Sequence, residues 1–323
     1  MIEWSYAINQ WKPSFDDFTR RRDHERALRV ISISGFTGVE LTTGTGRWEP
    51  LGNPEQLAAN FGSVRGFADF VRDAALDRVS SWFYDPLLGF REDLSAPADP
   101  ADPDAHASVR AHATWFASAL ADLGGQVLVV RPTASAWQRP QLDDGAIGTI
   151  AKCWNDVGRA IAPLGVRLAL HFDFLSALRP DDGLERLIAA TDTETVGFSV
   201  DTGEFVAAGL DPVAFIDRHP HRVAHVQLKN AAAVDDRDEY TRRNAEHHVR
   251  KGGGARPVPR WFLELGVAPG LVDAEAVVRA LVAHEYDGWV TVESDLSPHP
   301  PTSAMLNGWY LQHVLQSIVE EAR

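Results

Sequence analysis

The chain has 323 residues, of which 45% are hydrophobic, and 31 Lys and Arg residues against 45 Asp and Glu residues give a formal net charge of −14. This length and apolar content suffice for one large core, whereas the excess of negative charge disfavours binding to a nucleic-acid backbone. The single cysteine, Cys153, excludes both a disulfide framework and a zinc site built on cysteines. No apolar stretch reaches the roughly 20 residues of a membrane helix, and the first residues do not resemble a signal peptide, so we expect a soluble cytoplasmic protein without a membrane partner.

Strand-like and helix-like stretches alternate along the first half of the chain. The predicted strands are Ser5–Asn9, Val39–Thr42, Val79–Tyr84 and Val127–Val130. The predicted helices between and after them are Phe15–Ser34, Pro54–Ala75, Ala105–Leu123 and Ile147–Leu164. Gly35 and the pair Gly124-Gly125 follow two of these helices directly, and glycine at that position suits a helix C-terminus.

The second half continues the alternation with four short apolar runs that end in polar residues. These runs are Leu168–Asp173, Val196–Glu204, Val223–Asn230 and Trp289–Asp295, and the apolar part of each is predicted as a strand. The helices predicted between them are Leu184–Ala190, Pro212–Arg218 and Ala274–His284. Alternation without hairpin signals predicts parallel strands joined by crossover helices. Eight strands without a Gly-rich phosphate turn after the first favour a single (β/α)8 TIM barrel over residues 1–323 rather than an open sheet.

One connection is much longer than the others. Residues 231–260 follow the seventh predicted strand and contain seven Lys and Arg positions, two histidines and three successive glycines. Active sites of (β/α)8 barrels lie at the C-terminal ends of the strands, where this segment begins. We therefore expect either a lid over the barrel mouth or a disordered surface loop.

Polar residues alternate with apolar ones at the ends of the last strands. Because strand side chains alternate between faces, His171 shares a face with Asp173, Gln227 with Lys229, and Glu293 with Asp295. Buried polar groups are costly unless they meet a partner. In a closed barrel these groups converge, and a metal ion is the simplest partner that satisfies them together.

Each of these residues has a structural interpretation beside the functional one. Asp201 suits a hard divalent cation but also suits a helix cap. Glu293 is either a site residue or one half of an ion pair with an arginine. His171 is a metal ligand, a general base or a buried core histidine. The amide oxygen of Gln227 can ligate a metal, although a buried glutamine is more often a hydrogen-bonding spacer.

Lys229 is unusual because it lies inside an apolar strand in a chain with only four lysines. It is expected to stabilise a developing negative charge, to form a Schiff base with a carbonyl substrate, or to pair with a neighbouring carboxylate. Further candidates for binding substrate are Asn9, Glu40, Trp82, Arg131 and His225. Among these, Arg131 suits an anion or hydroxyl clamp, and Trp82 is expected either to stack on a sugar-like ring or to fill the core.

Four segments resemble a known family. Residues 201–212 (DTGEFVAAGLDP) resemble its DTGH…AGxDP motif, and residues 225–230 (HVQLKN) resemble its HxHxKD strand. Residues 262–273 (FLELGVAPGLVD) and 286–295 (YDGWVTVESD) also match its pattern. On these motifs the chain resembles the xylose-isomerase-like superfamily of sugar phosphate isomerases and epimerases, and within it the inosose dehydratase branch.

The resemblance implies a (β/α)8 barrel that holds a divalent metal, commonly manganese, cobalt or magnesium. Carried over by position, the metal ligands are His171, Asp201, Gln227 and Glu293. The family's metal-binding histidine is replaced by Gln227, as in the hydroxypyruvate isomerase branch, and the histidine of DTGH is replaced by Glu204. The aspartate of HxHxKD is replaced by Asn230.

The leading hypothesis is an isomerase, epimerase or dehydratase of carbohydrate or inositol metabolism that acts on a ketose or cyclitol ketone. The metal chelates the carbonyl and a neighbouring hydroxyl, Glu293 or His171 takes the carbon-bound proton, and Lys229 stabilises the developing charge. The first alternative is a metal-free Schiff-base lyase that uses Lys229. The second is a non-catalytic sugar-binding or partner subunit with a degenerate metal site. Homo-oligomerisation is left open.

Overall fold

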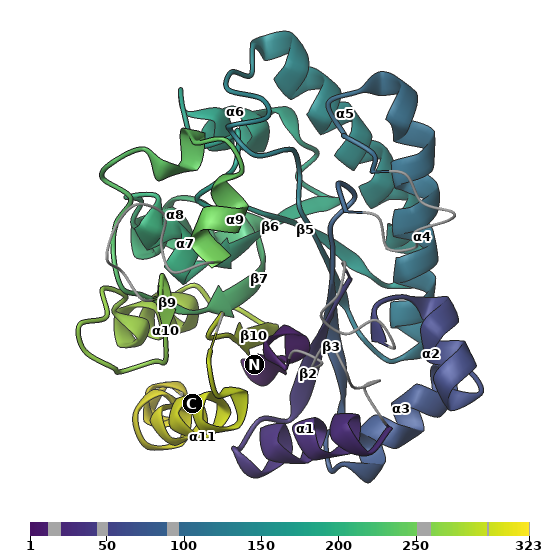
Figure 1. Ribbon diagram of the computed structural model, residues 1–323, viewed down its shortest axis with the longest axis vertical. Coiled ribbons are helices and arrows are strands. Elements are labelled where there is room, and N and C mark those ends of the chain that lie inside the picture. Colours follow the sequence, from purple (N-terminus) through teal and green to yellow (C-terminus); the bar gives the residue numbers. More distant parts are fainter. Residues whose placement is uncertain (12–20, 44–50, 89–96, 251–259, 296, 323) are drawn as a thin grey trace.

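The computed structural model describes residues 1–11, 21–43, 51–88, 97–250, 260–295 and 297–322. Eight parallel strands close into a barrel in the order β1-β10-β7-β6-β5-β4-β3-β2, with β1 pairing with both β10 and β2 (Figure 1). The strands are β1 (Glu3–Ala7), β2 (Gly38–Thr42), β3 (Arg78–Tyr84), β4 (Val127–Val130), β5 (Arg167–His171), β6 (Val196–Asp201), β7 (Val223–Leu228) and β10 (Trp289–Val292). The predicted (β/α)8 barrel is confirmed.

Helices surround the barrel (Figure 1). They are α1 (Arg21–Ile33), α2 (Pro54–Phe61), α3 (Val64–Asp73), α4 (His106–Asp122), α5 (Asp144–Ile161), α6 (Gly183–Ala190), α7 (Thr202–Ala207), α8 (Pro212–Arg218), α9 (Ala245–Arg250), α10 (Ala274–Ala283), α11 (Pro300–Tyr310) and α12 (Gln316–Glu321). A π-helical turn, η7 (Leu311–Leu315), joins the last two. Short 3-10 helices are η1 (Ile8–Gln10), η3 (Pro103–Ala105), η4 (Ala162–Leu164), η5 (Pro220–Arg222) and η6 (Glu239–Thr241). No helix in these described ranges is long and apolar enough to cross a membrane.

The helix predicted over residues 54–75 is two helices, α2 and α3. Gly62 ends α2 in the left-handed region with φ +81°, a conformation that suits glycine. Ser63 then caps α3 by accepting a hydrogen bond from the backbone N–H of Gly66. The apolar periodicity continues through both helices, which is why the pattern alone predicted one.

One predicted strand end is also corrected. The first strand ends at Ala7, and residues 8–10 form η1. β6 ends at Asp201, where the Asp201 side chain accepts a hydrogen bond from the Glu204 backbone N–H and thereby caps α7. The predicted start of the first helix, residues 15–20, lies outside the described residues.

The long segment after β7 has secondary structure of its own. A short strand, β8 (Asn230–Ala231), pairs antiparallel with β9 (Phe262–Leu263) and so ties the two ends of the segment together. Helices η6 and α9 lie between them. Residues 251–259 of the segment lie outside the described residues.

Polar side chains connect several strands inside the barrel. The Ser5 and Thr291 hydroxyls are 2.7 Å apart, and the His225 ring nitrogens lie 3.0 Å from the hydroxyls of Ser199 and Thr291. The Ser81 hydroxyl donates to Glu40 over 2.7 Å. These side chains are buried, so the hydrogen bonds supply the partners that buried polar groups need.

A buried histidine lies outside the barrel, on α1. His24 is 1% exposed and its ring lies 6.4 Å from that of Phe61. Burial lowers the pKa of His24 to about 4 from its ordinary 6.5, although the charge of Asp23 opposes the shift. The folded protein therefore keeps this imidazole neutral over a range in which the unfolded chain protonates it.

We predict that His24 contributes to acid sensitivity. Because its pKa is lowered in the folded state, its contribution to stability is complete above pH 6.5 and is lost as the pH falls towards 4. The difference in free energy of unfolding across this range is about 3 kcal/mol. Denaturant unfolding of wild type and His24→Leu between pH 7.5 and 4 measures it. Equal pH dependence in the two proteins would contradict the assignment.

Candidate active site

A cavity of about 210 Å³ opens at the C-terminal ends of the barrel strands. Its wall includes residues from η1, from β5, β6 and β7, and from the turns that follow β3, β4 and β10. The carboxylates that line it are Asp85, Asp173, Asp201, Glu204, Glu246, Glu293 and Asp295. The two permanently charged cations in this described wall are Arg131 and Lys229. The cavity therefore carries an excess of negative charge.

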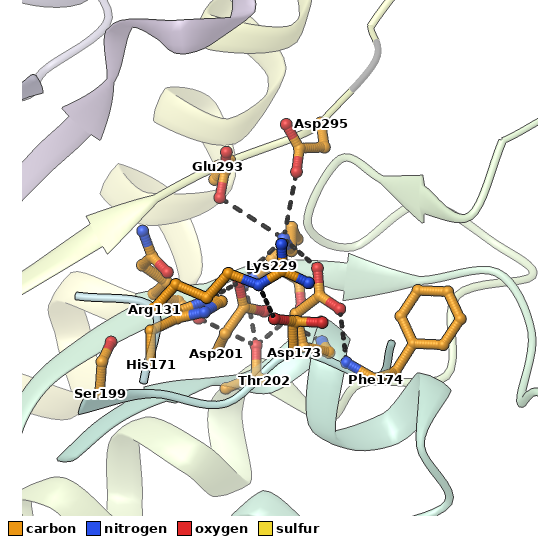
Figure 2. Close-up of polar contacts among 12 residues, drawn as sticks. Arg131, His171, Asp173, Phe174, Ser199, Asp201, Thr202, Lys229, Glu293 and Asp295 are labelled. Atoms are coloured by element: carbon orange, nitrogen blue, oxygen red, sulfur yellow. Dashed lines mark hydrogen bonds and ion pairs between the residues drawn. The ribbon is translucent and has the colours of Figure 1, made fainter. Parts of the chain in front are cut away.

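The Lys229 ammonium lies among four of these carboxylates (Figure 2). Its Nζ is 2.8 Å from Asp201 Oδ2 and 3.1 Å from Glu204 Oε1. The same nitrogen is 3.5 Å from Glu293 Oε2 and 3.4 Å from Asp295 Oδ2, and it lies 4.0 Å from the centre of the Phe262 ring. Because the side chain is 2% exposed, these contacts replace its hydration almost completely.

The two carboxylate oxygens of Asp201 have different partners. Oδ1 accepts from the Glu204 backbone N–H and caps α7, as the structural interpretation predicted. Oδ2 faces the cavity, where it lies 2.8 Å from the Lys229 ammonium and 3.4 Å from His171 Nε2. Capping thus fixes the carboxylate in place and leaves one oxygen for the site.

Three buried polar atoms of the cavity wall have no hydrogen-bond partner in the described part of the chain: His171 Nδ1, Gln227 Oε1 and Asn9 Oδ1. The amide nitrogen of Gln227 donates to Glu40 over 2.6 Å. A carboxylate accepts hydrogen bonds and cannot donate them, so Glu40 determines which way the amide points and leaves Oε1 unpaired. The amide nitrogen of Asn9 donates to Glu293.

Burial and charge shift the proton affinities of the Lys229 cluster. Burial lowers the pKa of Lys229, but the four carboxylates outweigh it and hold the pKa well above its ordinary value. Burial and Asp295 raise the pKa of Glu293 well above its usual range, against the effect of Lys229. Burial raises the pKa of Glu204 to about 7, again against Lys229. For Asp201 burial raises the pKa, and the attraction of Lys229 and His171 reverses this to a lowered value.

Arg131 organises a second ionic group in the cavity wall. Its guanidinium lies 3.1 Å from Asp173, 3.6 Å from Asp85 and 3.5 Å from Glu246. Glu246 belongs to α9, and it also accepts hydrogen bonds from the Ser135 hydroxyl and, over 2.7 Å, from the Trp137 indole. Part of the segment predicted as a lid therefore lies on the cavity wall; its opening and closing stays a prediction.

Seven of the predicted site residues line the cavity together: Asn9, Arg131, His171, Asp201, Gln227, Lys229 and Glu293. Glu40 and His225 do not line it. They lie deeper in the barrel, 3.2 Å apart, where Glu40 positions Gln227. Within the described chain, no three His, Cys, Asp or Glu side chains are already arranged as a metal centre.

Trp82 does not line the cavity and fills the core instead, the second of the two roles expected for it. It is fully buried and its ring packs edge-on against Phe116 of α4 at 5.2 Å, on the side of β3 that faces the helices. The next residue, Phe83, lines the cavity instead. Strand alternation explains the error, because the two neighbours point to opposite faces of the sheet and only one of them reaches the cavity.

Sequence reasoning placed Asp295 on one face with Glu293, among the polar groups expected to converge, but it named neither Asp295, Glu204 nor Glu246 as a site residue. Glu204 could have been found from the pattern, since it follows the predicted ligand Asp201 by three positions. Nothing local marks Glu246, which reaches the cavity only because α9 folds over it. Asn230 lies outside the cavity lining: its amide donates to the backbone carbonyls of Glu264 and Val267 and so orders the loop before α10.

Residues 28–308 match the protein family described as xylose isomerase-like TIM barrel. This chain belongs to that family. Among curated relatives, the inosose dehydratase of Clostridium beijerinckii is 26% identical over 145 residues, which are 45% of this chain and 45% of the relative. The inosose dehydratase of Lactiplantibacillus plantarum is 27% identical over 192 residues, 55% of this chain and 58% of the relative. The chain thus spans about half the length of the curated relatives it matches.

Solved structures share the fold over nearly the whole chain. A sugar phosphate isomerase/epimerase from Parabacteroides distasonis has a TM-score of 0.69 at 16% identity, with 97% of this chain and 98% of that chain covered. An L-ribulose 3-epimerase has a TM-score of 0.69 at 16% identity, covering 100% and 97%. The IOLI protein, solved with a bound zinc atom, has a TM-score of 0.62 at 12% identity, covering 99% of each chain.

We predict that Glu246 attaches α9 to the barrel. Glu246→Ala removes the contacts to Arg131, Ser135 and Trp137, so amide hydrogen exchange in residues 239–250 is expected to increase severalfold. Arg242→Ala is the matched control in the same segment, because Arg242 is 47% exposed and pairs only locally with Glu239. Exchange that rises equally in both variants would contradict the prediction.

Proposed function

We propose that this protein is a divalent-metal-dependent isomerase, epimerase or dehydratase of a ketose or a cyclitol ketone. One observation carries the proposal. His171 and Gln227 line a cavity whose carboxylates outnumber its cations, and the buried atoms His171 Nδ1 and Gln227 Oε1 have no hydrogen-bond partner in the described part of the chain. Buried polar atoms of this kind indicate a missing ligand.

The donor chemistry fits a divalent ion. His171, Asp201, Gln227 and Glu293 offer one imidazole, two carboxylates and one amide oxygen on the same cavity wall. An oxygen-rich set with one imidazole suits manganese, magnesium or cobalt. The hydrogen bond from Gln227 to Glu40 supports this assignment, because an outer partner that orients a ligand is characteristic of metal sites.

When bound, such an ion polarises a substrate carbonyl as a Lewis acid. The chain's own residues supply the proton transfer. Glu293 is the candidate base or acid, since its raised pKa suits a carboxyl group that exchanges a proton with a carbon acid, and Asn9 fixes one of its oxygens. Lys229 places a positive charge beside it that stabilises the negative charge developing on the substrate oxygen. His171 is the second candidate for the proton transfer.

The names of the relatives support the substrate class. Inosose dehydratases act on a cyclitol ketone by name, and L-ribulose 3-epimerase acts on a ketose. Both reactions begin with loss of a proton from carbon next to a carbonyl, which is the step that the Glu293 region is suited to perform. Return of the proton gives isomerisation or epimerisation, and expulsion of a β-hydroxyl gives dehydration.

The geometry weighs against the Schiff-base alternative. A lysine attacks a carbonyl only as the neutral amine. Four carboxylates within 3.5 Å hold Lys229 as the ammonium. A non-catalytic sugar-binding subunit is the remaining alternative, and metal content with turnover distinguishes it from the enzyme.

Glu293→Gln is expected to lower kcat on a responsive inosose or ketose by roughly 10²- to 10⁴-fold, because the amide cannot exchange the proton. Glu320→Gln, an exposed glutamate of α12, is the matched control and is expected to keep full activity. The measurement is steady-state turnover over a panel of inososes and ketoses. Near-full activity of the Glu293 variant would exclude its role.

Chelation provides a separate prediction. Dialysis against EDTA is expected to abolish turnover, and added manganese is expected to restore it. Borohydride added with substrate is expected to leave no mass increase on the Lys229 peptide, since the ammonium does not form an imine. Activity that survives chelation together with a trapped Lys229 adduct would favour the Schiff-base lyase instead.

A further inference from the structure

The four carboxylates around Lys229 fall into two pairs. Asp201 and Glu293 belong to the proposed ligand set, whereas Glu204 and Asp295 do not. The ammonium contacts both pairs, at 2.8 and 3.5 Å in the first and at 3.1 and 3.4 Å in the second. One cation therefore already bridges the two carboxylate ligands, Asp201 and Glu293. Figure 2 shows its contacts with one carboxylate of each pair, Glu293 and Asp295.

We propose that Lys229 is a built-in competitor of the divalent metal: its ammonium bridges Asp201 and Glu293 in the metal-free protein and is displaced onto Glu204 and Asp295 when the metal binds. The inference rests on the proposed function, because it takes those two residues as ligands. Like charges repel strongly in a site of low dielectric, so the ammonium and a divalent ion do not share the same oxygens without cost. The second pair of carboxylates, which the ammonium already contacts, can hold it when it withdraws from Asp201 and Glu293.

The surroundings of the cluster agree with such a displacement. The Lys229 main chain is fixed, because its N–H donates to the Thr202 hydroxyl over 2.9 Å and its carbonyl accepts from the same hydroxyl over 2.7 Å. Gly203 lies against the side-chain stem, where an added Cβ would come within 3.0 Å of Lys229 Cγ. The anchored backbone leaves the side-chain torsions to carry the movement, and rotation of a lysine stem is a small change.

His171 and Gln227 supply the second, independent sign of a ligand. They are 6% and 3% exposed, and each carries an atom without a partner in the described part of the chain. The ammonium satisfies the carboxylates but neither of these atoms, because no contact joins it to them in the described structure. Lys229 thus offsets part of the negative charge of the site but leaves these two atoms without a partner.

The test is calorimetric titration of manganese into EDTA-stripped protein, which reports metal affinity without turnover. Lys229→Met removes the charge and keeps much of the volume, and it is expected to lower Kd for manganese at least tenfold. Lys152→Met is the matched control, because Lys152 is also paired with an aspartate, at 2.7 Å, but is 68% exposed. Its Kd is expected to equal that of wild type.

A double-mutant cycle tests where the ammonium goes. Asp295→Asn is expected to weaken manganese binding severalfold when Lys229 is present and much less in the Lys229→Met background, since only the first protein needs the second carboxylate pair. Asp173→Asn, which removes a cavity carboxylate that pairs with Arg131, is expected to act equally in both backgrounds. This control separates the proposed effect from a general loss of negative charge.

The outcomes are distinct. Tighter binding by Lys229→Met together with coupling to Asp295 supports the proposal. Equal or weaker binding by Lys229→Met overturns it and leaves the metal-dependent function standing, whereas no binding by either protein overturns both. If Lys229→Met unfolds without metal, the same cycle is run with Lys229→Gln, and the rise in Tm with manganese replaces Kd as the measurement.

Discussion

The site depends on one constraint: four buried carboxylates at the barrel mouth need a cation. Asp201, Glu204, Glu293 and Asp295 converge there because three barrel strands end side by side. Their mutual repulsion and the loss of hydration are offset by the Lys229 ammonium. Removing one partner of a buried ion pair typically lowers the free energy of unfolding by about 3–5 kcal/mol. The stability of the barrel mouth therefore depends on the balance between these carboxylates and the ammonium. A site of this kind is stable only when some cation occupies it, which gives Lys229 a structural role as well as a chemical one.

Buried polar side chains below the cavity fix the orientation of residues in its wall. Glu40 receives hydrogen bonds from Ser81 and Gln227 and lies 3.2 Å from His225. The result is a buried layer in which each member limits the orientation of the next. Because Glu40 can only accept, it selects the amide face that Gln227 presents to the cavity. The cavity wall is therefore preorganised from underneath, and little rearrangement is needed when a ligand arrives.

The sequence predicted the barrel and most of the site because both follow from local patterns. Alternating apolar runs and crossover helices determine the fold class, and strand alternation placed His171, Gln227, Lys229 and Glu293 on the inward side. Trp82 was a candidate because it lies near the end of an early strand, but that position does not say which face its side chain takes, and Phe83 lines the cavity instead. Glu246 was beyond prediction, because its position depends on the path of a long segment rather than on any repeating pattern. The contacts of Lys229 with four carboxylates likewise required coordinates, since a sequence shows charges but not which of them share one point.

The two ionic groups of the cavity wall differ in whether their polar atoms already have partners. The Arg131 guanidinium forms ion pairs with three carboxylates, Asp85, Asp173 and Glu246. Glu246 belongs to α9 and so attaches that helix to the same group. Around Lys229, Gln227 Oε1 and His171 Nδ1 are buried atoms that have no hydrogen-bond partner among the described residues. The substrate class of the proposed function, a neutral polyhydroxylated ketone, suits this division, because its hydroxyls can exchange hydrogen bonds with the carboxylates of the Arg131 group. An anionic group has no comparable place in the described wall, where both permanent cations are already neutralised by several carboxylates. The charge distribution that holds the cavity wall together thus agrees with the neutral substrate class of the proposed function.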